Sequence, residues 1–181
     1  YIVWDRKIDF LKEVLAAPLN RSTVFLGKCL GGVTDSMIQV TIIIVLGFFI
    51  FPDLEYTLQS LMLVYLYLFL LAVIMTSLGL IIGSRMDSPE GFSLITSLVV
   101  FPMYFLSGAL FLKKNLIDEA PLIYWITAIN PASYAVDAIR YTLIPEEIFL
   151  EYGLSRDLAV LIGFCVFLLA LGTQSFKTMK L

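Results

Sequence analysis

Residues 58–83 read LQSLMLVYLYLFLLAVIMTSLGLIIG and contain no charged side chain. As an α-helix that rises 1.5 Å per residue, this stretch is about 39 Å long. The hydrocarbon core of a bilayer is about 30 Å thick, so the helix would cross it with some tilt. Similar apolar stretches occupy residues 29–51, 91–112 and 158–176. The sequence therefore predicts four membrane-spanning helices.

The composition of the whole chain also indicates a membrane protein. Of the 181 residues, 60% are hydrophobic and 15% are charged, and the mean hydropathy is +0.93. Soluble domains are roughly half apolar and one quarter charged. A chain of this length could bury an adequate core in water, so the surplus of apolar residues indicates a second apolar solvent, the bilayer. We expect an all-α polytopic membrane protein that forms a single transmembrane domain over residues 1–181.

Several classes of function are disfavoured. The net charge is −3 and no basic stripe is present, so we expect no nucleic-acid partner. The chain has no histidine, and its cysteines, Cys29 and Cys165, lie in apolar stretches, so we expect no metal site and no catalytic residue. Gly27-Lys28 does not complete a phosphate-binding loop, because Ser22 replaces the first glycine and Cys29 replaces the Ser or Thr. We therefore expect no cofactor in this chain and no ATP hydrolysis by it.

Residues 1–28 form the most charged long stretch, and apolar side chains recur in it at helical spacing. The pattern predicts an amphipathic cytoplasmic helix that is too polar to span and that Pro18 ends. Such a helix can act as a lever that receives force from a soluble partner, or it can lie on the lipid surface, and the pattern leaves both interpretations open. Because the sequence begins with Tyr1 and not Met, we expect it to start inside a longer chain.

The apolar stretch at residues 122–144 is irregular, because Asn130-Pro131 interrupts it and Asp137 and Arg140 lie in its second half. The residue before a proline is biased away from the helical conformation. We therefore predict two short helices that dip into the membrane and return. Asp137 and Arg140 are spaced to pair on one helix face, either as a gate or, as we favour, as a structural brace.

Asp35 lies inside the first predicted span. It marks a polar lumen or a subunit interface, or it lies near the membrane surface because its helix starts deeper in the cytosol, which is the interpretation we favour. The spacing of Gly27 and Gly31 permits close approach of another helix, although such pairs are common in apolar helices.

The distribution of basic residues predicts the orientation. With a cytoplasmic start and four spans, eight of the twelve Lys and Arg residues lie inside, as the positive-inside rule requires. Five inner residues precede the first span; the other inner ones are Arg85, Lys177 and Lys180, and the outer ones are Lys113, Lys114, Arg140 and Arg156. A full crossing by residues 122–144 would give the same counts, so charge does not decide that segment.

Three blocks of sequence resemble the permease subunit of type-2 ABC exporters, the group that includes drug-resistance and polysaccharide or lipid-linked sugar exporters. The first block is LAAPLNR at residues 15–21, continuing to Gly27-Lys28. The second is FPMYFLSGALF at residues 101–111. The third is PLIYW at residues 121–125 followed by NPASYAVDAIR at residues 130–140.

This resemblance implies a protein of six spans, with the first and most of the second upstream of Tyr1. It implies that the opening helix is a coupling helix that docks on a separate ABC ATPase subunit, which binds ATP and Mg. Residues 116–144 would be a pair of extracytoplasmic re-entrant helices, and two permeases would pair as a homo- or heterodimer in the prokaryotic plasma membrane. The cargo would be a drug, a lipid or a lipid-linked glycan.

Candidate site residues follow from both lines of reasoning. The coupling candidates are Asp5, Arg6, Asp9, Lys12, Glu13, Pro18 and Arg21; the gate or re-entrant candidates are Asn130, Pro131, Asp137 and Arg140; the pathway candidates are Asp35, Phe105, Ser107 and Gly108. The alternative functions are an ion-coupled secondary transporter, a membrane-embedded enzyme or another polytopic membrane subunit. A secondary transporter is expected to show broken spans in matching halves, whereas only one broken segment and no internal symmetry are visible.

Overall fold

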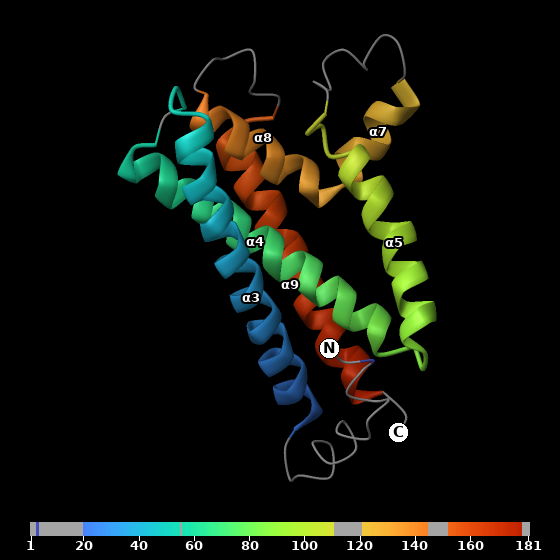
Figure 1. Ribbon diagram of the computed structural model, residues 1–181. Helices are drawn as coiled ribbons and strands as arrows, with labels where there is room; N and C mark the ends of the chain where they lie inside the picture. The colour runs from blue at the N-terminus through green and yellow to red at the C-terminus, as the bar shows by residue number, and fades with distance from the viewer. Residues whose placement is uncertain (1–2, 4–19, 55, 111–120, 145–151, 179–181) are drawn as a thin grey trace.

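The computed structural model describes residue 3 and residues 20–54, 56–110, 121–144 and 152–178. Within these ranges the chain forms helices and no strand, which confirms the all-α prediction. The helices are α3 (Arg21–Ile50), α4 (Leu58–Gly83), α5 (Pro89–Phe105), α7 (Pro121–Ile129), α8 (Pro131–Leu143) and α9 (Leu154–Lys177) (Figure 1).

Three of these helices, α3, α4 and α9, are long and apolar enough to cross a membrane, with 30, 26 and 24 residues. These helices agree with the membrane protein that the composition predicts. α4 has the bounds expected from the sequence, and its start is fixed by Thr57, whose side-chain oxygen accepts a hydrogen bond from the Ser60 backbone nitrogen. α3 begins before the predicted apolar span, because the helix continues through the polar residues that precede Cys29.

The end of α5 corrects the predicted third span. Its start is capped by Ser88, but the helix ends at Phe105 and not at residue 112. Pro102 removes one backbone donor from its last turn, and a turn at residues 106–108 follows the helix, in which Gly108 adopts a φ of 81°. At about 26 Å, α5 is shorter than a hydrocarbon core. The count of four full spans therefore stays a prediction.

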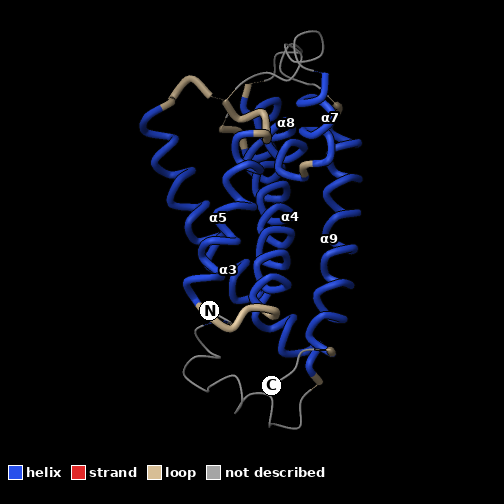
Figure 2. The backbone as a smooth tube through the Cα atoms, turned by 90° about the vertical axis from the view of Figure 1, so that its right-hand side faces the viewer, coloured by secondary structure: helices blue, strands red, loops and turns tan. Residues whose placement is uncertain are grey.

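The long helices pack around α4, which contacts α3, α8 and α9. Figure 2 shows α3, α4, α5 and α9 running between the two ends of the molecule, with α7 and α8 gathered at one end. One buried cluster joins the first half of α3 to the second halves of α4 and α9. It includes Phe25 and Phe176, whose ring centroids lie 5.1 Å apart in an edge-to-face arrangement. A second cluster joins α4, α8 and α9 and includes Tyr67, Tyr134 and Leu161. In contrast, α5 has no buried residue.

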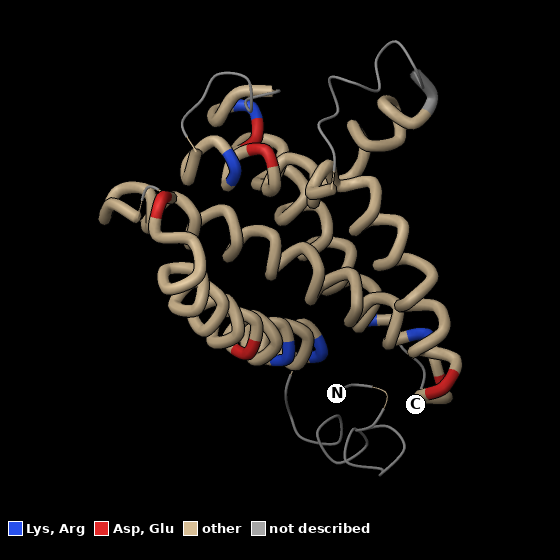
Figure 3. Tube along the Cα trace, turned by 45° about the horizontal axis from the view of Figure 1, so that its top comes forward, with Lys and Arg blue, Asp and Glu red and all other residues tan. Residues whose placement is uncertain are grey.

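Most charged residues of the described chain lie toward the two ends of the bundle (Figure 3), whereas Asp35 lies within α3. Four basic residues, Arg21, Lys28, Arg85 and Lys177, lie toward the end where α3 begins and α9 finishes. Two, Arg140 and Arg156, lie toward the end that carries α7 and α8. This separation agrees with the predicted orientation, in which the first end faces the cytoplasm.

Candidate functional site at the junction of α5 and α8

The break between α7 and α8 is fixed by Asn130 and Pro131. Asn130 has extended backbone angles, and its side-chain oxygen accepts a hydrogen bond from the Ala132 backbone nitrogen at 3.0 Å, which caps α8. Pro131 follows at the first helical position, where its missing N–H costs nothing. Two short helices, α7 and α8, thus meet at this break, and both lie at the end of the bundle opposite the start of α3 and the end of α9 (Figure 1). Whether they dip into the membrane stays a prediction.

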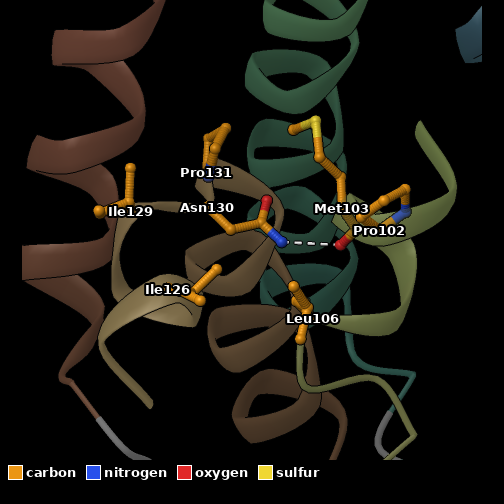
Figure 4. Close-up of a pocket in the computed structure, with 7 residues that line it drawn as sticks. All are labelled: Pro102, Met103, Leu106, Ile126, Ile129, Asn130 and Pro131. Carbon is orange, nitrogen blue, oxygen red and sulfur yellow. Dashed lines mark hydrogen bonds between the residues drawn. The ribbon is translucent and has the colours of Figure 1, made fainter. Parts of the chain in front are cut away.

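α8 also supplies hydrogen-bond donors to the end of α5. Three of these bonds join α8 and its cap to α5 and the turn after it: from Asn130 Nδ2 to the Met103 carbonyl oxygen (2.7 Å, Figure 4), from Ser133 Oγ to the Leu106 oxygen (3.2 Å), and from Arg140 Nη2 to the Gly108 oxygen (2.5 Å). A fourth, longer bond runs from the same Arg140 nitrogen to the Ala109 oxygen (3.4 Å). The last carbonyl groups of a helix lack partners within the helix. Here Asn130 satisfies the Met103 oxygen of the last turn, and Ser133 and Arg140 bond the Leu106 and Gly108 oxygens that follow the helix. We call these six residues the α5–α8 junction.

The turn at the end of α5 is held in place from within. Ser107 is buried; its hydroxyl donates to the Tyr104 oxygen at 2.7 Å and accepts from the Ala109 nitrogen at 3.2 Å. Gly108 follows in the left-handed region, where a side chain would be strained. This geometry points the Gly108 oxygen at Arg140. The turn thus presents a backbone oxygen to a cationic side chain.

The hydrogen bonds of Asp137 and Arg140 reach two different segments. Arg140 bonds to the end of α5, whereas Asp137, which is 2% exposed, accepts a hydrogen bond from the Tyr152 backbone nitrogen at 2.9 Å. Tyr152 directly precedes α9. One short helix is therefore tied to α5 by one side chain and to the start of α9 by another, which makes α8 a mechanical link between them.

Aromatic contacts strengthen the side of this link that faces α9. The ring of Tyr152 stacks on Tyr134 at 4.8 Å, and the Arg156 guanidinium lies over the same ring at 5.1 Å. The Tyr134 hydroxyl donates to the Ala128 oxygen at 2.6 Å, which ties α7 to α8. Burial raises the pKa of the Tyr134 phenol, so the hydroxyl keeps its proton and remains a donor at neutral pH.

An open cavity of about 320 Å³ lies beside the α5–α8 junction. Its lining residues are Pro102, Met103, Leu106, Ile126, Ile129, Asn130 and Pro131 (Figure 4). Asn130 is the one residue of this lining with a polar side chain, and its amide is already engaged with α8 and with Met103. The cavity therefore suits an apolar chemical group.

The structure brings some predicted residues together and separates others. Gly108 meets the predicted gate residue Arg140 at the junction, to which Asn130 also belongs, and Ser107 stabilises the turn beside Gly108. Asp35 lies on α3, away from this site, and the side chain of Phe105 is exposed. Sequence reasoning missed Ser133, although its position three residues after Asn130 places both on one helix face.

The predicted coupling residues fall mostly outside the described part of the chain. These are Asp5, Arg6, Asp9, Lys12, Glu13 and Pro18. Arg21 is described: its guanidinium donates to the Lys177 backbone oxygen at 3.5 Å, which joins the start of α3 to the end of α9. The segment predicted to contact the ATPase subunit is thus followed by α3, whose first residue, Arg21, contacts the end of α9.

Comparison with known proteins agrees with this architecture. The family model described as ABC-2 type transporter matches residues 1–144. A protein of Cyanophora paradoxa named "Putative transport permease ycf38" is 30% identical over 147 residues, which cover 77% of this chain and 47% of the relative. Proteins of the same name from Porphyra purpurea and Pyropia yezoensis are each 28% identical over 141 residues, with the same coverage. The chain spans about half the length of these relatives, and no solved structure matches it.

Proposed function

The chain belongs to the ABC-2 type transporter family of membrane proteins, and from this premise we propose that it forms the permease part of an ATP-driven exporter. Membership makes it a membrane transport permease of the ABC-2 type. The further steps are ours: ATP and Mg are bound by a separate ABC ATPase subunit, two permeases pair, and cargo leaves the cytoplasm across a prokaryotic plasma membrane. The family match over residues 1–144 carries the proposal, because it includes both the charged opening segment and the α5–α8 junction.

The proposed mechanism is alternating access by rigid-body motion. Movement of the ATPase subunit pushes the segment at residues 1–28, which continues into α3. Phe25 passes the displacement from α3 to α9 through its edge-to-face contact with Phe176. The contacts of Asp137 with Tyr152 and of Arg140 with Gly108 then couple α9 to α8 and α8 to α5.

The α5–α8 junction is the element that we propose to open and close. Its bonds join single side chains to backbone oxygens, and α5 buries no residue against the rest of the described chain. Few apolar contacts oppose a shift of α5, so a push of modest energy can break the junction. The apolar cavity beside it supports a cargo with an alkyl or aromatic portion, as in a drug, a lipid or a lipid-linked glycan.

The experiment combines charge reversal with the intact transporter complex. The double variant Asp9→Lys and Glu13→Lys removes the acidic character of the opening segment, so we expect membrane insertion to persist while export stops. ATP hydrolysis by the co-purified ATPase should lose its dependence on the permease. The matched control is Asp53→Lys, an exposed change in the turn between α3 and α4 at the other end of the bundle.

Two results would refute the proposal. One is normal export and normal stimulation of ATP hydrolysis in the double variant, which would remove the coupling role. The other is cargo movement in reconstituted vesicles that requires an ion gradient and no nucleotide, which would place the protein among ion-coupled secondary transporters.

A further inference from the structure

Asp35 lies near the middle of α3 with its side chain exposed. The buried residues of α3 in this region, Cys29 and Val33, lie on another face and pack against α4. Thr34 and Gln39 are exposed as Asp35 is. The chain therefore places a carboxylate and two polar neighbours on the side of α3 that faces away from the bundle.

Two contacts fix the depth of Asp35 relative to α4. On the cytoplasmic side of it, Cys29 Sγ lies 3.5 Å from Ser77 Oγ. On the other side, the Tyr65 hydroxyl donates to Thr41 Oγ1 at 3.0 Å. Asp35 thus lies at a level between Ser77 and Tyr65, within the stretch of α4 that has no charged residue. This depth, between Ser77 and Tyr65 of α4, does not support the expectation that Asp35 lies near the membrane surface.

A carboxylate that faces lipid at this depth is unfavourable, because hydrocarbon offers neither water nor a hydrogen-bond donor. Among the described residues, none donates a hydrogen bond or forms an ion pair with Asp35. Its neighbour Thr34 is engaged with the Leu30 oxygen at 2.8 Å. The group that compensates this charge therefore comes from outside the described chain.

The same side of α3 has room for another helix. A β-carbon added at Gly27 or Gly31 would meet nothing within 4 Å, and both glycines are exposed. Gly32, on the inner side, behaves differently, because a β-carbon there would lie 2.6 Å from Thr76 Cγ2. Glycines four residues apart let two helix backbones approach closely in a membrane.

We propose that a further membrane-spanning helix packs on this surface and presents a Lys or Arg side chain to Asp35. The surface, which we call the outer α3 face, consists of Gly27, Gly31, Asp35 and Ile38. A basic side chain both neutralises the carboxylate and supplies its hydrogen bonds. A second copy of α3 fits poorly, because two-fold packing through this face would bring one Asp35 against the other. This inference concerns assembly and does not depend on the exporter proposal.

Photocrosslinking in the complete complex, in native membranes, identifies the occupant. A benzoylphenylalanine in place of Ile38, which is 56% exposed on the outer α3 face, should form an adduct with a membrane-spanning peptide that contains Lys or Arg. Mass spectrometry of the crosslinked peptide reads this directly. The same photoprobe at Val166 of α9, which is 63% exposed, is the positional control and should not yield that peptide.

Substitutions of Asp35 then separate a basic partner from lipid. Asp35→Lys should reduce the adduct about tenfold through like-charge repulsion, and changing the captured Lys or Arg to Glu should restore it. Asp35→Leu has opposite outcomes in the two cases. If lipid alone covers the face, Asp35→Leu should raise the thermal stability of the complex. If a basic helix pairs with Asp35, Asp35→Leu leaves that helix with an unpaired charge and should lower the thermal stability of the complex.

Glycine substitutions supply the steric test. Gly31→Ile should lower the adduct at Ile38, whereas Gly163→Ile, at an exposed glycine of α9 with equally open space, should leave it unchanged. Adducts only with lipid, with α3 of a second copy, or with a helix that has no basic residue would overturn the inference. So would an adduct that Asp35→Lys leaves undiminished. Each of these results is possible in a complex that still exports cargo and hydrolyses ATP, so it would leave the proposed function standing.

Discussion

The ring of Phe25 lies against the backbone of Gly172, in the space that a β-carbon at position 172 would occupy. This contact joins α3 to α9 within the buried cluster that includes Phe25 and Phe176. Gly172→Ala forces a methyl group into the ring, so we expect a loss of about 1–3 kcal/mol of stability. Thermal unfolding of the purified protein in mild detergent measures it.

A matched control and a rescue variant isolate the steric cause of that loss. Gly163→Ala, also in α9 but with nothing near its β-carbon, should have no destabilising effect. Phe25→Leu removes the ring, so Gly172→Ala should cost less in that background than in the wild type. Equal losses in both backgrounds would show that the ring contact is not the cause.

Arg140→Ala should release the end of α5 from α8. The guanidinium donates to the Gly108 oxygen at 2.5 Å, and the same nitrogen lies 3.4 Å from the Ala109 oxygen. Removing it leaves the left-handed turn at Gly108 without its external partner. Hydrogen exchange measured by mass spectrometry should therefore become faster at residues 106–110.

Arg156→Ala is the control for that experiment. Arg156 lies at the same end of the bundle and contacts the ring of Tyr152, but it makes no hydrogen bond to α5 among the described residues. Exchange at residues 106–110 should match that of the wild type. A faster rate in both variants would mean that general loosening, and not the bond to Gly108, controls this turn.

Much of the fold could be predicted from local chemistry. The charge-free run of α4 and the Asn130-Pro131 break gave the right elements, because span length and proline geometry act within a few residues. The end of α5 could not be predicted in the same way. Residues 106–112 are as apolar as the helix before them, but the helix ends at Phe105, and Gly108 turns the chain where Arg140 of α8 donates a hydrogen bond to its oxygen.

The candidate site was predictable in its residues but not in its connections. Asp137 and Arg140 stood out as charges in an apolar stretch, and their spacing suggested a pair. Their partners are backbone groups of segments distant in sequence, at Tyr152 and Gly108, and no local pattern indicates such contacts. Asp35 is the reverse case: its position was evident, but its outward direction depends on which side of α3 packs on α4.

Asn130→Asp should separate the two roles of Asn130. An aspartate keeps an oxygen that caps α8 through the Ala132 nitrogen, but it has no amide to donate to the Met103 oxygen. We expect α8 to persist while the junction weakens by about 1–3 kcal/mol, since two oxygens then face each other. Thermal unfolding of Asn130→Asp and Asn130→Ala gives the comparison.

The contribution of the bond to Met103, free of the repulsion in Asn130→Asp, follows from Asn130→Ser, which still caps α8 but is too short to reach α5 in the same way. If Asn130→Ser and Asn130→Asp lose similar stability, the missing bond to Met103 accounts for the loss. If only Asn130→Ala is destabilised, the cap is what matters and the junction does not depend on this bond.

The two turns that flank α4 should be labelled from opposite sides of the membrane. Asp53 lies between α3 and α4, Asp87 lies between α4 and α5, and both are exposed. Both native cysteines, Cys29 and Cys165, are buried, so an impermeant maleimide has little background. The positive-inside rule predicts that the end carrying Arg21, Lys28, Arg85 and Lys177 is cytoplasmic, so Asp87→Cys should react only in inside-out vesicles and Asp53→Cys only in intact cells. The reverse result would place residues 1–28 outside the cell, where no ATPase could reach them, and would end the coupling mechanism while leaving the packing of α3, α4 and α9 untouched.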